Sequence, residues 1–100
     1  MFVIRQTDVF STWLWGLRDQ RAKQKITGRL QRLKFGHLGD VEPVGHGVSE
    51  LRIHEGKGYR VYFRQQGDEL ILLLCGGDKK SQKRDIARAH CLWKELGNDA

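Results

Sequence analysis

Hydrophobic and polar side chains alternate in two neighbouring runs near the middle of the chain. In residues 48–54 the apolar positions are Leu51 and Ile53, and in residues 59–64 they are Tyr59, Val61 and Phe63. A period of two is typical of a strand with one buried face. Residues 55–58, between the runs, include two glycines, which accept the positive φ of a tight turn. The two runs are therefore predicted to form a β-hairpin.

Two further runs predict strands. Residues 70–75 are apolar at every position, which favours a central strand covered on both faces. Residues 2–6 form a shorter run with Phe2 and Ile4 on one side. Residues 37–47 are polar and rich in glycine, and we expect a loop that contains the only proline, Pro43, and a carboxylate at Glu42.

Apolar residues recur at helical spacing in three segments. The first helix begins at Thr7 or Asp8, either of which can cap it, and a tight break follows at residues 18–20. The second runs from about residue 21 to 34 and ends at Gly36. The third follows Ser81, and residues 97–100 are expected to be a frayed tail. The apolar stripes are Phe10, Trp13, Leu14 and Leu17; Ala22, Ile26, Leu30 and Leu33; and Ile86, Ala89, Trp93 and Leu96.

The order of these elements is strand, helix, helix, three strands, helix. It predicts an α+β fold in which an antiparallel sheet packs against helices. One hundred residues suffice for one domain, residues 1–100.

The predicted hairpin gathers basic residues on one face. Arg52, His54, Arg60 and Arg64 alternate with the apolar positions, and Tyr62 lies among them. Like charges so placed repel each other unless an anion lies between them. Lys79 follows the third strand of this region and could close the group at its end. The group is interpreted either as an anion site or as solvated basic residues on an open sheet face.

Composition favours a polyanionic partner. Eighteen Lys and Arg against 12 Asp and Glu give a net charge of +6, spread along the chain rather than in a tail. The basic outer face of the second helix could likewise contact phosphate or remain solvated. No run reaches the ~20 apolar residues of a membrane span, and the first residues lack the pattern of a signal peptide. We expect a cytoplasmic protein without a membrane partner.

Cofactor and metal chemistry receive no support from the motifs. Cys75 and Cys91 lie in apolar surroundings, and the four histidines lack zinc-type spacing. The remaining set, a basic face with a His, a Tyr and Glu42, can cleave RNA without a metal. The 2′-hydroxyl is an internal nucleophile that needs a base, cations for the phosphorane and an acid for the leaving 5′-oxygen.

Three segments resemble the RelE/HigB superfamily of bacterial toxins, in particular the subgroup described as addiction-module killer proteins. They are residues 51–54 (LRIH), 58–62 (GYRVY) and 73–80 (LLCGGDKK). The resemblance implies a RelE-like fold over nearly the whole chain and cleavage of mRNA on the ribosome. It also implies a neutralising antitoxin encoded nearby, often a helix-turn-helix protein similar to HigA.

The resemblance also implies roles for single residues. Arg60 matches the arginine that stabilises the phosphate, and Arg52 and His54 match two basic strand residues, either of which could be the base. Lys79 matches a basic residue after the last strand, and Glu42 a loop glutamate proposed as base. We expect further RNA contacts from Lys57, Tyr62, Arg64 and Lys80.

One departure from the family pattern concerns the general acid. Some relatives carry a Tyr or a His-Tyr pair near the C-terminus, where this chain has Asp85 and a tail without either. The acid is therefore unassigned. Two alternatives stay open: a non-enzymatic toxin of the same fold that inhibits DNA gyrase, and a plain RNA-binding module.

Overall fold

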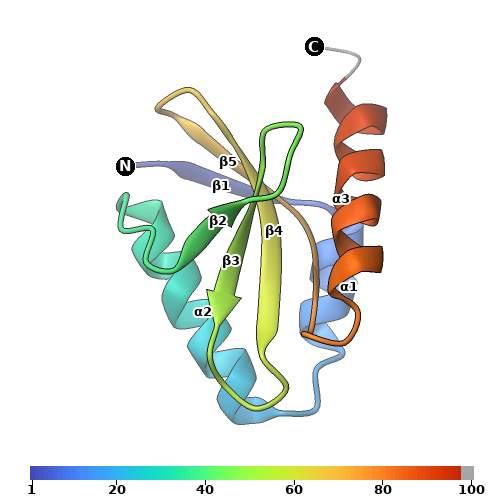
Figure 1. Ribbon diagram of the computed structural model, residues 1–100. Coiled ribbons are helices and arrows are strands. Elements are labelled where there is room, and N and C mark those ends of the chain that lie inside the picture. Colours follow the sequence, from blue (N-terminus) through green and yellow to red (C-terminus); the bar gives the residue numbers. More distant parts are fainter. Residues whose placement is uncertain (98–100) are drawn as a thin grey trace.

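A five-stranded mixed sheet forms the centre of the molecule, for which we describe residues 1–97 of a computed structural model (Figure 1). The strand order is β1-β5-β4-β3-β2. Only β1 runs parallel to its neighbour, β5, and the other pairs are antiparallel. The predicted α+β fold is confirmed. The strands are β1 (Val3–Gln6), β2 (Val41–Pro43), β3 (Val48–Ile53), β4 (Tyr59–Gln66) and β5 (Leu70–Gly77).

Helices α1 (Asp8–Trp15) and α2 (Gln20–Lys34) pack on one face of the sheet. Each begins at a side-chain cap: Thr7 accepts a hydrogen bond from the amide of Phe10, and Asp19 accepts one from the amide of Ala22. Such caps satisfy amides that have no partner within the helix. The buried side chains of this face form the larger core, which includes Phe10, Ile26, Leu33, Leu51, Phe63, Ile71 and Leu73.

Helix α3 (Gln82–Gly97) covers the opposite face over β4 and β5. An irregularity in the β4–β5 register pairs Tyr62 with Cys75 but Phe63 with Leu73. The extra residue, Leu74, therefore points to the same side as Cys75, and both join a second core beneath α3. Because β5 is covered on both faces, its prediction as a central strand is right.

The structure corrects three expectations. The segment 37–47 is not wholly a loop, because β2 lies within it and pairs with β3. Gly97 belongs to α3 rather than to a frayed tail, and residues 98–100 lie outside the described part of the chain. The basic sheet face is not open, because α3 covers part of it. Among residues 1–97, no helix has the length and hydropathy to cross a membrane.

Candidate functional site

Strand register places Arg52 of β3 directly opposite Arg60 of β4, and Arg60 opposite Gly77 of β5. We call Arg52 and Arg60 the arginine pair. The next row across the same face holds Glu42, Glu50, Tyr62 and Cys75. Two directly opposed cations repel, so a sheet that holds them needs an anion close by.

The anion is the side chain of Glu50, which is fully buried. Its Oε1 accepts a hydrogen bond from Arg52 Nε at 3.0 Å, and its Oε2 accepts one from the Tyr62 hydroxyl and one from Gln82 Nε2, each at 2.9 Å. Arg60 Nε lies 3.4 Å from Oε2 as an ion pair. The anion expected between the basic residues is thus supplied by the protein itself.

These contacts determine the charge of Glu50. Burial alone would raise the pKa of its carboxyl group, but hydrogen bonds from Gln82, Arg52 and Tyr62 and the charge of Arg60 outweigh burial. The pKa therefore falls below its ordinary value, and the group stays ionised. An ionised carboxylate with its oxygens occupied is a poor proton acceptor, so Glu50 holds the arginine pair in place instead.

Tyr62 is completely buried, and burial followed by its hydrogen bond to Glu50 raises its pKa well above the ordinary value. The hydroxyl is a donor committed to Glu50. The expectation that Tyr62 contacts RNA is therefore wrong, since α3 and the neighbouring strands separate its ring from any ligand.

A second carboxylate extends the arrangement from Arg52 to His54. The backbone amide of Arg52 donates to the carbonyl of Asp40, and Nε2 of His54 lies 2.5 Å from Oδ2 of Asp40. This hydrogen bond, together with the nearby His54, Arg52 and Arg29, lowers the pKa of Asp40 and outweighs the opposing effect of burial. Basic and acidic side chains thus alternate, and we call them the charge ladder: Arg60, Glu50, Arg52, Asp40 and His54.

The lysines gather at the Arg60 end of the ladder. Arg60 Nη1 donates to the carbonyl of Gly58 at 3.3 Å, and the amide of Lys79 donates to the carbonyl of Lys57 at 3.4 Å. Lys57, Lys79 and Lys80 line one surface depression together with Asp78. The structure therefore brings the three predicted lysines together beside Arg60.

Two other predicted residues lie elsewhere. Glu42 is exposed on the edge strand β2, opposite Glu50. Its carboxylate is close enough to help raise the pKa of Arg52. Arg64 lies at the other end of β4, where it pairs with Val48 in register and its guanidinium covers the ring of Trp93. Arg64 is therefore separate from the arginine pair, contrary to the expectation of one cluster.

Sequence analysis missed the groups that organise the site. Alternation places Glu50 on the same face as Arg52 and His54, but it gives no information on whether a helix covers that face. Gln82 reaches Glu50 from the first turn of α3, and Gly77 lets that turn approach, because a Cβ there would overlap the carboxylate of Asp85. Within residues 1–97, no three His, Cys, Asp or Glu side chains are grouped to hold a metal ion.

Comparison with known proteins places this fold among RelE-like proteins. A chain in the crystal structure of the toxin–antitoxin complex RelBE2 from Mycobacterium tuberculosis superposes with a TM-score of 0.62 at 18% identity, over 78% of this chain and 98% of that chain. The sequence pattern of the family "Phage derived protein Gp49-like (DUF891)" matches residues 12–94, and the chain belongs to that family. An uncharacterized protein of Haemophilus influenzae is 51% identical over 94 residues, 94% of this chain and 95% of the relative.

Proposed function

We propose that the protein is the toxin of a toxin–antitoxin module and that it cleaves RNA at the charge ladder. The observation that carries the proposal is the arginine pair held on a buried carboxylate. Among residues 1–97, Arg52 uses only its Nε in side-chain contacts, so its Nη atoms remain for a ligand. Arginine suits a phosphate because its planar fork donates parallel hydrogen bonds.

The proposed reaction is an internal transesterification of RNA. The ribose 2′-oxygen attacks the adjacent phosphorus, the bond to the 5′-oxygen breaks, and the products are a 2′,3′-cyclic phosphate and a 5′-hydroxyl. The arginine pair stabilises the charge of the phosphorane. His54, oriented by Asp40, takes the 2′-hydroxyl proton, and Glu42 is the alternative base. The leaving 5′-oxygen takes a proton from solvent water at the exposed end of the site, where Lys79 lies.

The substrate and partners are inferred from resemblance. The RelE/HigB-like segments favour mRNA on the ribosome as substrate, and the fold neighbour was solved as a toxin–antitoxin complex, which favours an antitoxin as partner. We propose a small antitoxin similar to HigA. The basic surface around Lys57, Lys79 and Lys80 suits the phosphates of mRNA or of ribosomal RNA.

Induced expression in a bacterial host tests this function. Wild-type protein should arrest growth and produce new mRNA 5′ ends within translated regions, and blocking translation should remove them. Arg60→Ala should lose both effects, whereas Arg5→Ala, an exposed cation on the edge strand β1, should keep them. DNA damage without mRNA cleavage would instead indicate gyrase inhibition, and RNA binding without cleavage would indicate a binding module.

Folding must be controlled in the Arg60 variant. The Arg60 side chain is 13% exposed and neutralises Glu50, so its loss should cost about 1–3 kcal/mol of stability. Arg60→Lys keeps the charge without the planar fork and should fold with much lower cleavage.

A further inference from the structure

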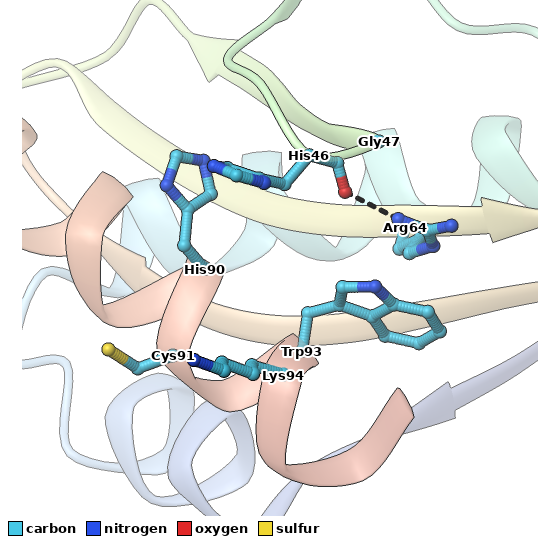
Figure 2. Close-up of a pocket in the computed structure, with 7 residues that line it drawn as sticks. All are labelled: His46, Gly47, Arg64, His90, Cys91, Trp93 and Lys94. Atoms are coloured by element: carbon cyan, nitrogen blue, oxygen red, sulfur yellow. Dashed lines mark hydrogen bonds between the residues drawn. The ribbon is translucent and has the colours of Figure 1, made fainter. Parts of the chain in front are cut away.

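A second surface pocket lies on the α3 face at the opposite end of β4 from Arg60. It has a volume of ≈730 Å³ and takes its walls from the β2–β3 loop, β4 and the C-terminal half of α3 (Figure 2). We call it the histidine–tryptophan pocket, after its lining residues His46, Arg64, His90, Trp93 and Lys94. Of the described residues, none that line it is acidic or aliphatic.

Arg64 is fixed within this pocket. Its guanidinium carbon lies 4.0 Å from the centre of the Trp93 ring, and its Nη1 donates to the carbonyl of His46. Gly47 permits this approach, since a Cβ at that position would overlap the guanidinium. Arg64 Nε is buried and has no hydrogen-bond partner among residues 1–97. The cation is thus held in place before any ligand arrives.

The two histidines form the other wall. Their rings meet edge to face with centroids 4.6 Å apart, and His90 Nε2 donates to the carbonyl of Val44 at 2.9 Å. His46 is exposed and has a φ of 55°, in the left-handed region that a non-glycine residue adopts at a cost. Residues in such conformations are concentrated at functional sites.

We infer that the histidine–tryptophan pocket binds one nucleotide of single-stranded RNA, remote from the scissile phosphate. Arg64 and Lys94 take the phosphate, and the His46 ring provides a face for the base. An acidic peptide would share the phosphate contacts, but docking of a peptide also uses aliphatic and aromatic anchors, and the pocket has no aliphatic wall. This inference rests on the proposed function.

The position of the pocket suits a single strand that also reaches the charge ladder. Arg60 and Arg64 lie on one strand and one sheet face, four residues apart. Four residues of a strand span about 13 Å, a distance that a few nucleotides of single-stranded RNA can bridge. The pocket therefore holds RNA on one side of the cut and helps to fix which bond reaches the arginine pair.

Binding of a non-cleavable RNA tests the inference apart from catalysis. The probe is a labelled 2′-O-methyl oligonucleotide of about eight nucleotides, titrated by anisotropy at several salt concentrations. The variant His46→Asn/Lys94→Ala keeps the fold, because asparagine tolerates a positive φ and Lys94 is exposed. We expect its affinity to fall about tenfold or more and its salt slope to fall by about 0.7. The matched control is Arg18→Ala, an exposed cation in the α1–α2 loop, with affinity near wild type.

A wild-type measurement locates the ligand. In a two-dimensional ¹⁵N spectrum, the oligonucleotide should shift the indole N–H signal of Trp93, assigned with Trp93→Phe, and leave that of Trp15 in place. Unchanged affinity in the double variant, no RNA binding by the wild type, or equal displacement of the RNA by a polyglutamate of matched charge would each overturn the inference. Binding that depends on the pocket without mRNA cleavage would reject only the proposed nuclease.

Discussion

At the scale of single residues, the two arginines of the site depend on one carboxylate. Arg52 and Arg60 face each other across β3 and β4, and Glu50 contacts the Nε of both. A buried carboxylate with these donors remains charged, whereas the same carboxylate without them would be costly to bury. Glu50 therefore couples the stability of the fold to the proposed binding of an RNA phosphate by Arg52 and Arg60.

Glu50→Gln tests that coupling. It keeps the size of the side chain but removes the charge, so the arginine pair loses its counterion. We expect a loss of about 2 kcal/mol, below the value for a fully buried pair, because the Arg52 side chain keeps 33% exposure. Urea unfolding of both proteins measures this loss in the free energy of unfolding. Glu42→Gln, on the exposed neighbouring position of the same row, is the control and should change stability by less than about 0.5 kcal/mol.

The stability difference between wild type and Glu50→Gln should change with pH in a defined direction. The pKa of Glu50 is lower in the folded protein than in the unfolded chain, so its ionised form stabilises the fold above the unfolded value of about 4.3. That contribution is lost as pH falls through the folded pKa. Wild type and Glu50→Gln should therefore differ most near neutral pH and converge below about pH 4. A constant difference down to about pH 3 would contradict the assigned role.

At the scale of elements, glycines determine how closely α3 and β5 pack. Gly77 is buried against Asp85, and Gly76 lies against the ring of Trp13 on the other face. β5 therefore accepts a helix on each side only because these positions lack a Cβ. The same closeness brings Gln82 to Glu50, so the packing of α3 also orders the site.

Two glycine substitutions should act in opposite directions. Gly28→Ala, in the middle of α2 with open space at its Cβ, should stabilise the protein by about 0.5–1 kcal/mol. Gly77→Ala should destabilise it by about 1–3 kcal/mol, because the added Cβ meets the Asp85 carboxylate. Thermal unfolding measures both. Equal effects of the two changes would contradict the packing described for α3.

Sequence periodicity was sufficient for most elements but not for the site. The hairpin of β3 and β4, the cap at Thr7 and the end of α2 near Gly36 follow from local patterns, whereas the cap at Asp19 was not predicted. β2 has only three residues and exists because it pairs with β3. The role of Glu50 depends on contacts with Gln82, 32 residues away, and local patterns carry no information on such contacts.

At the scale of the whole molecule, the basic residues behind the net charge of +6 differ in whether they are paired with a carboxylate. Glu50 offsets one of the two charges of the arginine pair, so the pair contributes directed hydrogen bonds more than long-range attraction. Free positive charge lies on the exposed lysines beside it, Lys57, Lys79 and Lys80. Those lysines should attract the RNA, and the arginines should act on the phosphate once it has arrived.

The salt dependence of RNA binding separates these roles. Lys79→Ala/Lys80→Ala should lower the slope of log affinity against log salt by about 1.4, at ~0.7 for each cation with single-stranded RNA. The control Arg5→Ala/Lys34→Ala removes equal charge from β1 and from the last turn of α2 and should leave the slope nearly unchanged. If the control lowers the slope equally, the RNA-binding surface extends to β1 and the end of α2.

The most direct measurement of the central claim is single-turnover cleavage of a defined ribosome–mRNA complex by purified protein. The mRNA carries a ribose or a 2′-deoxyribose at the nucleotide before the cut. We predict that the ribose substrate yields a 2′,3′-cyclic phosphate, that the deoxy substrate is not cleaved, and that Arg60→Lys, with its fold verified, is slower by about a hundredfold or more. Cleavage of the deoxy substrate, or an Arg60→Lys rate equal to wild type, would contradict RNA cleavage by the arginine pair.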